Sequence, residues 1–397
     1  MKLSQKVEKI ETSQTMAVAA QSALLKKQGI EIIDLIVGEP DFPTPENIKQ
    51  AAIDAINSDY TKYTANNGVL ELRSAIKEKY KTEQNLDYSE DEIMISSGAK
   101  QCVYNAMLSI VSEGDEVIIP APYYVSYPHI VHLAGGKSVI VNTEEKQGFK
   151  INAEMLEESV TEKTKVLLLC NPCNPTGTVY TEQELSELMT VVKKHNMFVI
   201  CDEIYEKLVF DNAKHICITK TAPDYKEKIV IVNGMSKSYA MTGWRVGYAL
   251  ADKNLISAMA KIQSHSTSST NSISQAASVE AIKGPQDSVE FMRKEFEERR
   301  NFLYTALNEI EGISCYKSPG AFYMFPNVKS FFGKSYNGQK INDSKDFALF
   351  LINEARVAIV PGTAFGANGF IRISYAASLQ DLQKAIDAIK QTIIKLK

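Results

Sequence analysis

Short apolar runs alternate with helical patterns through the middle of the chain, between residues 92 and 251. The apolar runs are EIMIS, EVIIP, SVIVN, VLLLC, FVIC, IVIVN and VGYALA. Helical periodicity separates them near residues 100–111, 124–134, 153–159 and 182–195. Strands this uniformly apolar are covered on both faces. The pattern therefore predicts an α/β fold in which a mostly parallel seven-stranded sheet lies between helices.

The two ends of the chain predict a second, smaller α+β domain. A helix over residues 15–28 is followed by a short strand, a Gly/Pro-rich loop and two further helices. The segment after residue 251 predicts a helical region, a charged helix, three strands and an amphipathic helix: 253–282, up to 310, 322–325, 357–360, 369–375 and 379–396. We expect an N-terminal arm that joins the small domain, a large domain and a small domain: 1–45, 46–285 and 286–397.

The composition is that of an ordinary soluble protein, with 44% apolar residues, 23% charged residues and a net charge of −4. Without a basic excess, no nucleic-acid partner is expected. No run is long enough to cross a membrane and the first residues lack the apolar core of a signal peptide, so we expect no membrane partner and a cytoplasmic location.

The six cysteines include one CxxC pair, Cys170 and Cys173. A metal site would need a second pair, so no metal is expected.

Polar residues follow several of the apolar runs, at the point where each strand should end. Ser97-Gly98, residues 171–177, Asp202 and Lys237 all lie at such ends, and ligands of parallel sheets bind outside the carboxyl ends of the strands. A lysine in this position can lose its proton and act as a nucleophilic amine. The helix start after Gly98 and the guanidinium of Arg245 can hold a phosphate.

Three motifs at these strand ends resemble those of a known enzyme family. The stretch SKSYAMTGWRVGY resembles the Schiff-base motif of fold-type I pyridoxal-phosphate enzymes, NPCNPTG is similar to their N-P-x-N-P-T-G, and DEIY is similar to D-E-x-Y. The resemblance covers essentially the whole chain and is strongest to class I aminotransferases, most of all the bacterial Ib aspartate aminotransferases of the aspartate/prephenate branch. It implies the fold of aspartate aminotransferase and pyridoxal 5′-phosphate as cofactor, bound by the large domain.

The resemblance also implies a role for individual residues around the cofactor. Lys237 would carry the cofactor as a Schiff base and move the proton at the substrate Cα, Asp202 would hold the proton on the ring nitrogen, and Tyr205 and Asn174 would bind the 3′-oxygen. The phosphate would lie on a set of residues that includes one from the opposite subunit of a homodimer with shared active sites: Gly98, Ala99, Lys100, Ser236, Arg245 and the partner-facing Tyr63. Tyr124, rather than its neighbour Tyr123, would stack on the ring.

The substrate would be held at its two ends. Arginine is best shaped to bind the α-carboxylate as a bidentate partner, and by resemblance this residue is Arg372. The backbone at Gly38 and the side chains of Asn174 and Tyr124 would add contacts. Lys100 would meet a distal carboxylate together with an N-terminal Ser/Thr segment that matches Ser13 and Thr15.

These assignments imply a transaminase that moves the amino group of aspartate or glutamate to 2-oxoglutarate or oxaloacetate by a ping-pong mechanism. Two alternatives remain on the same fold, namely an aspartate/glutamate–prephenate aminotransferase and a C–S lyase. A ligand-sensing module would carry an added helix-turn-helix segment, for which we find no spare stretch. A serine acyl-transfer enzyme is disfavoured because Ser97-Gly98-Ala99-Lys100 lacks the S-D-N and K-T-G motifs that must accompany S-x-x-K.

Overall fold

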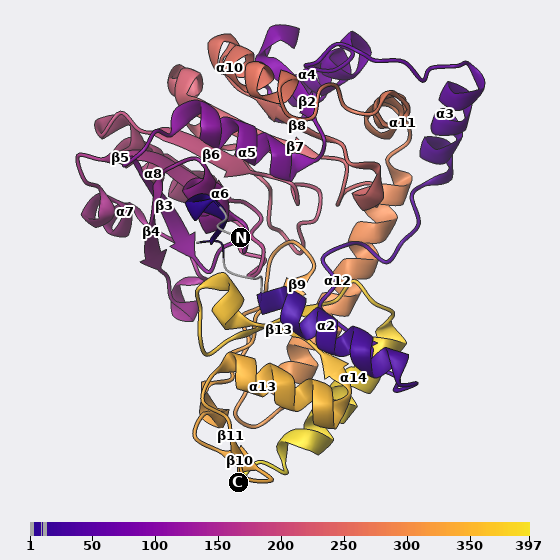
Figure 1. Cartoon of the computed structure of the whole chain (residues 1–397), viewed down its shortest axis with the longest axis vertical. Helices are drawn as coiled ribbons and strands as arrows, with labels where there is room; N and C mark the ends of the chain where they lie inside the picture. Colours follow the sequence, from indigo (N-terminus) through magenta and orange to yellow (C-terminus); the bar gives the residue numbers. More distant parts are fainter. Residues whose placement is uncertain (1–3, 9, 11–13) are drawn as a thin grey trace.

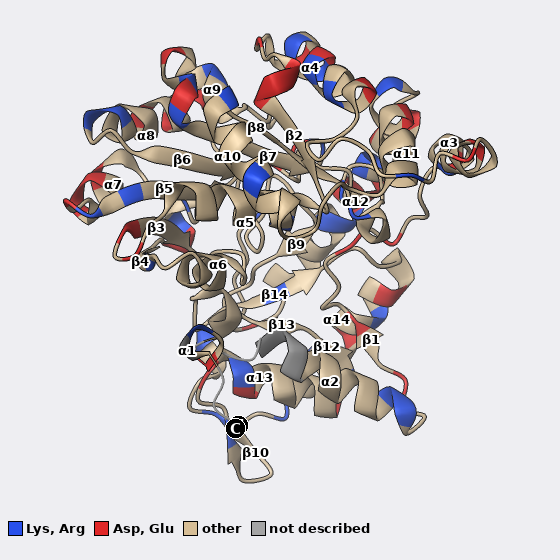
Figure 2. Ribbon diagram, turned by 45° about the horizontal axis from the view of Figure 1, so that its top comes forward, with Lys and Arg blue, Asp and Glu red and all other residues tan. Residues whose placement is uncertain are grey.

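The computed structural model describes residues 4–8, 10 and 14–397. It contains a large lobe built on one seven-stranded sheet and a small lobe in which the N-terminal helix α2 (Gln14–Lys27) lies beside the C-terminal elements (Figure 1). Charged residues gather on outer helices of the large lobe such as α4 (Leu70–Gln84) and α8 (Glu182–Lys194), and α9 (Ile218–Thr221) lies on the same side (Figure 2). Within the described residues, no helix combines the length and the apolar character needed to cross a bilayer.

The seven apolar runs of the sequence form the seven strands of the central sheet. Its strand order is β2-β8-β7-β6-β5-β3-β4, and only β8 runs against its neighbours. The strands are β2 (Ile93–Ser96), β3 (Glu116–Ala121), β4 (Lys137–Asn142), β5 (Thr164–Cys170), β6 (Phe198–Asp202), β7 (Ile229–Gly234) and β8 (Gly247–Leu250). The predicted α/β fold with a mostly parallel sheet is confirmed.

Helices cover both faces of this sheet because successive side chains of a strand point to opposite sides. In β7, Val230 and Val232 pack with α5 (Ala99–Ile110), α6 (Tyr127–Leu133) and α10 (Lys253–Ser264), whereas Ile229 and Ile231 pack with α4, α8 and α11 (Ser272–Lys283). The other helices of this lobe are α3 (Glu46–Asn57), α7 (Ala153–Ser159) and α9. Both faces of the inner strands are therefore dry, whereas the edge strand β4 is partly exposed, and the ends of the inner strands remain available to ligands.

The small lobe packs an aromatic core between short strands and helices. Its strands form a β13-β14-β9 sheet and a parallel β1-β12 pair. The elements are β1 (Ile33–Asp34), α12 (Asp287–Asn308), β9 (Tyr323–Met324), α13 (Ser344–Phe350), β12 (Val357–Ala358), β13 (Val360–Pro361), β14 (Ile371–Ser374) and α14 (Leu379–Ile393), with the β10–β11 hairpin (Ser335–Tyr336, Gln339–Lys340) at the edge. The domain limits expected from the sequence stay a prediction.

One predicted element is wrong in its extent. The helical region expected over residues 253–282 is two helices, α10 and α11, separated by residues 265–271. Ser268 has a φ of +57°, and the side chain of Asn271 caps α11 by accepting a hydrogen bond from the Ser274 N–H at 2.9 Å. Serine, threonine and asparagine side chains bond to nearby backbone groups and so compete with a continuous helix.

Candidate active site

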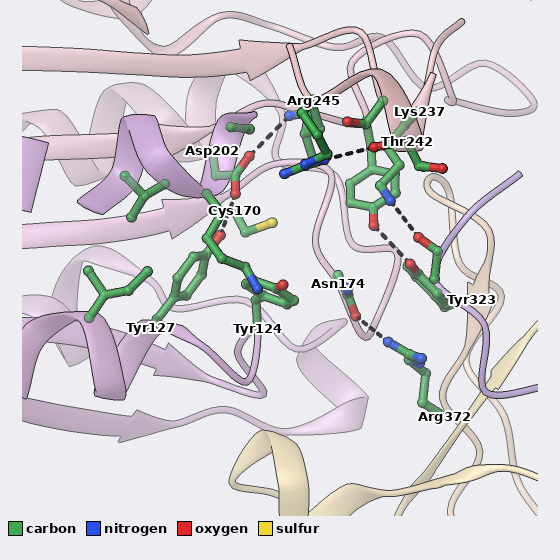
Figure 3. Close-up of a pocket in the computed structure, with 18 residues that line it drawn as sticks. Tyr124, Tyr127, Cys170, Asn174, Asp202, Lys237, Thr242, Arg245, Tyr323 and Arg372 are labelled. Carbon is green, nitrogen blue, oxygen red and sulfur yellow. Dashed lines mark hydrogen bonds between the residues drawn. The ribbon is translucent and has the colours of Figure 1, made fainter. Parts of the chain in front are cut away.

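A cavity of about 290 Å³ opens where the carboxyl ends of the central strands meet the small lobe (Figure 3). Its lining includes most residues singled out in the sequence: Gly38, Ala99, Lys100, Tyr124, Asn174, Asp202, Tyr205, Ser236, Lys237, Arg245 and Arg372. They come from the ends of β2, β3, β5, β6 and β7, from the segment after β1, and from β14. Residues more than 300 positions apart thus face one space.

Lys237 lies three residues after the end of β7, and its amine reaches across the cavity. Nζ donates a hydrogen bond to the carbonyl of Gly38 in the segment after β1. Burial lowers the pKa of Lys237 to about 8, and the nearby guanidinium groups of Arg372 and Arg245 act in the same direction, against the carboxylate of Glu39. A substantial share of this amine is therefore neutral near physiological pH, as a nucleophile requires.

Asp202 is the last residue of β6 and is 7% exposed. Its Oδ2 accepts a hydrogen bond from Tyr127 Oη at 2.8 Å, and its Oδ1 accepts one from the Ile204 N–H at 3.3 Å. Burial raises the pKa of Asp202 to about 6, although both hydrogen bonds and the charge of Lys237 oppose the shift. A buried carboxylate whose charged form is disfavoured is stabilised by a cationic partner.

Arg372, on β14, is 6% exposed and only partly paired. Its Nη1 donates to Asn174 Oδ1 at 3.2 Å and its Nη2 to the Ile36 carbonyl at 2.6 Å. Among the described atoms, its buried Nε has no hydrogen-bond partner. A buried guanidinium with an unused donor is suited to a carboxylate ligand.

The opposite end of the cavity is suited to an anion with several oxygens. Helix α5 begins at Ala99, and the first backbone N–H groups of a helix have no partner within it. The guanidinium of Arg245 lies next to the start of α5. Its Nη1 donates to the Thr242 carbonyl at 2.8 Å and its Nη2 to the Ser97 carbonyl at 3.4 Å. Gly98 has a φ of +95°, and a Cβ there would lie 2.9 Å from Cζ of Arg245. Only glycine therefore allows the guanidinium this close to the helix start.

Some predicted site residues lie outside the cavity of this chain. Tyr63, in the loop between α3 and α4, is 93% exposed and does not line it. Ser13 lies outside the described residues, and Thr15 belongs to α2 without a described side chain. Tyr123 lines a separate, smaller cavity together with Cys173, so of the two neighbouring tyrosines Tyr124 is the one that faces the main site.

Sequence reasoning missed several residues that complete the lining: Val103, Tyr127, Ile130, Cys170, Ile204, Thr242 and Tyr323. Tyr127 and Tyr323 matter most, since each bonds to a polar group of the cavity. Each tyrosine lies in a stretch with an apolar pattern, PYYVSYP and GAFYMF, where it reads as part of the core. No signal in the sequence separates a tyrosine that fills space from one that directs a hydrogen bond.

Comparisons with known proteins agree with this geometry. Residues 30–389 match the family model of class I and II aminotransferases. A probable aspartate/prephenate aminotransferase of Rickettsia conorii is 47% identical over 393 residues, which cover 98% of each chain. The aspartate aminotransferase structure from Rhizobium meliloti matches with a TM-score of 0.97 and 42% identity over 100% of each chain. That of Thermus thermophilus with maleate matches with 0.93 and 37%, over 99% of this chain and 100% of the other. This chain belongs to the class I and II aminotransferase family.

Proposed function

We propose that this aminotransferase uses pyridoxal 5′-phosphate to transfer the amino group between aspartate or glutamate and the corresponding 2-oxo acids. The observation that carries the proposal is one cavity that holds a partly neutral lysine amine, a buried carboxyl group and an incompletely paired arginine. Its two ends differ in kind, because one is suited to a phosphate and the other to a carboxylate. Acid–base chemistry at a carbon next to a carboxylate needs this combination.

The residues present fit the cofactor. The start of α5, Ser236 and Arg245 would hold the phosphate, and Gly98 leaves room for the arginine. Asp202 would pair with the protonated ring nitrogen, while Tyr205 and the amide nitrogen of Asn174 would donate to the 3′-oxygen. When bound, the cofactor supplies an aldehyde that links to an amine and a ring that withdraws electrons from the substrate Cα.

The residues of this chain would then divide the work of the reaction. Arg372 holds the α-carboxylate, with its Nε and Nη groups as donors, and so orients the bond between Cα and hydrogen. Once its amine is free, Lys237 acts first as a base that takes the proton from Cα. It then acts as an acid that donates this proton again, which completes the proton transfer. Asp202 stays ionised and keeps a proton on the ring nitrogen opposite.

The substrate class follows from two cationic side chains of the cavity besides Lys237 and Arg245. Lys100 lies at the start of α5, its Nζ is 5.5 Å from the centroid of the Tyr124 ring, and it lines the same cavity as Arg372. A dicarboxylate would pair with both groups. The maleate in the Thermus relative is such a molecule, and the name of the Rickettsia relative favours prephenate as a second acceptor.

A homodimer would complete the site. Tyr63 is almost fully exposed in this chain, although exposed aromatic side chains of this size are uncommon. Other exposed apolar residues of this surface lie on α3, in the loop that follows it and at the start of α4: Ile53 and Ile56, Tyr60, and Leu70. In the proposed dimer this surface is covered, and Tyr63 reaches the phosphate of the partner subunit.

The visible spectrum of the cofactor-loaded protein tests this proposal. Aspartate should bleach the band of the lysine-linked cofactor and 2-oxoglutarate should restore it, with one glutamate formed for each aspartate consumed and no ammonia or pyruvate. Borohydride reduction followed by peptide mapping should find the cofactor mass on Lys237. Lys237→Arg should abolish turnover, whereas Lys261→Arg, at an exposed lysine of α10, is the matched control. Release of ammonia would favour a lyase, and a mass tag on another lysine would refute the assignment.

A second assay addresses prephenate. With glutamate as donor, prephenate is supplied as the only acceptor, and consumption of glutamate is followed against the same reaction with 2-oxoglutarate. Turnover with both acceptors would show that the protein has the activity of an aspartate/prephenate aminotransferase. Turnover with 2-oxoglutarate alone would restrict it to aspartate transamination.

A further inference from the structure

Tyr323 touches three separate parts of the cavity wall. It lies on β9, is fully buried, and faces Arg372 (Figure 3), and it also contacts Tyr205. Its hydroxyl is 2.8 Å from the hydroxyl of Tyr205, its ring centroid is 4.5 Å from Cζ of Arg372, and a Cβ at position 38 would lie 3.3 Å from its hydroxyl. One side chain of the small lobe thus meets the large-lobe tyrosine, the arginine and the segment after β1.

The hydroxyl pair has a preferred direction. A phenol can donate one hydrogen bond and accept others at the same time. The two hydroxyls are 2.8 Å apart, and either could donate to the other. In the function proposed above, the proton of Tyr205 is donated to the 3′-oxygen of the cofactor. With that proton used, Tyr205 can only accept within the pair, so Tyr323 donates to it.

The ring of Tyr323 acts on a different group. A guanidinium over the face of an aromatic ring is attracted by it, and the flat contact limits how the guanidinium can turn. Arg372 also faces the Phe365 ring, with Cζ 5.2 Å from its centroid. The two rings and the bonds to Asn174 and Ile36 hold the guanidinium in one orientation, with its Nε free for a ligand.

We propose that Tyr323 is a positioning residue with two separable actions in the transamination proposed above. Its hydroxyl fixes the proton of Tyr205 toward the 3′-oxygen of the cofactor, and its ring fixes Arg372 toward the substrate carboxylate. Because the residue lies in the small lobe, it transmits the position of that lobe to a large-lobe group that binds the cofactor. Neither action requires Tyr323 to touch the reacting atoms.

The two actions can be separated by substitution. Tyr323→Phe removes the hydroxyl and keeps the ring, so Tyr205 loses a donor and becomes a weaker donor itself. We expect the pH midpoint of the visible band to rise by a few tenths of a pH unit and kcat to fall about 3- to 10-fold, with KM for aspartate nearly unchanged. Tyr323→Leu also removes the ring, and KM for aspartate should then rise about 3- to 10-fold.

Tyr375→Phe is the matched control for the loss of a buried phenol hydroxyl. Tyr375 is fully buried, donates to the Ala321 carbonyl at 3.2 Å and does not line the cavity. Its variant should keep the parent pH midpoint, kcat and KM. If Tyr323→Phe behaves like this control, or if it changes only the melting temperature, the inference is wrong. Failure of the proposed function would look different, since the parent protein itself would then form no visible band with pyridoxal phosphate, or would release ammonia from aspartate instead of forming glutamate.

Discussion

Replacement of Asp202 by asparagine tests whether burial sets the electrostatics of the site. In the folded cofactor-free protein the pKa of this carboxyl is about 6, against an ordinary value of 3.8. The folded state therefore binds more protons than the unfolded state between these two values, and the free energy of unfolding falls as pH rises through that window. The fall totals about 3 kcal/mol, at 1.36 kcal/mol for each of about two pKa units.

The Asp202→Asn variant carries no such titration. Its amide keeps the partners of the carboxyl, because Oδ1 can accept from the Ile204 N–H while the hydroxyl of Tyr127 turns to accept from Nδ2. The stability of the variant relative to the parent should therefore increase with pH, by about 1.5 kcal/mol between pH 5 and pH 7.5. This change with pH is unaffected by any pH-independent difference between the free energies of unfolding of the two proteins.

Urea unfolding of both cofactor-free proteins at several pH values, at one protein concentration, measures this quantity. Activity of the loaded enzyme should move the opposite way and fall about 100- to 10,000-fold, since the ring nitrogen loses its anionic partner. A stability difference that stays constant from pH 5 to pH 7.5 would refute the reasoning about burial. Full activity in the variant would refute the role of Asp202.

Four further outcomes follow from the geometry. Gly98→Ala should leave the protein folded but weaken cofactor binding roughly 10- to 100-fold in a titration, because the methyl group displaces Arg245 and the backbone is strained at a φ of +95°. In cofactor-free protein, acylation of Lys237 should rise with pH around a midpoint of about 8, and peptide mapping that finds the ordinary midpoint of a surface lysine would contradict the burial argument. Arg372→Lys should raise KM for aspartate about 30-fold or more with a smaller change in kcat, since a single ammonium cannot replace the fork of donors. Lys100→Met should raise KM for aspartate roughly tenfold and leave that for alanine unchanged, and an equal effect on both would remove Lys100 from substrate selection.

The sequence predicts the large sheet well because one physical requirement dominates it. A strand buried on both faces must be apolar at nearly every position, and seven such runs are visible without any structure. The polar residues that follow them then lie at one edge of the sheet. This is why Asp202 and Lys237 could be assigned to a common site before their contacts were known.

The elements that the sequence does not predict are those decided by competition or by distant packing. The Ser/Thr-rich residues 264–271 carry a visible warning against one continuous helix, but apolar periodicity on either side outweighs it. Helix α13 is absent from the elements that the sequence predicts. It begins at Ser344, after the N-cap Asp343, whose side chain accepts from the N–H groups of Lys345 and Asp346, and its position depends on packing of the small lobe. Tyr323 likewise acquires a role only through the approach of β9 to Tyr205.

The pKa values of the site are the clearest example of a property that the amino-acid sequence alone does not predict. Burial pushes Lys237 and Asp202 toward their neutral forms, although one is a base and the other an acid. Near neutral pH the ionised Asp202 thus costs the cofactor-free protein folding free energy. A protonated ring nitrogen would pair with this carboxylate and offset the cost, so part of the burial penalty becomes affinity for the cofactor. On this reasoning Asp202→Asn gains stability only while the cofactor is absent, and its advantage over the parent should vanish or reverse once pyridoxal phosphate is bound.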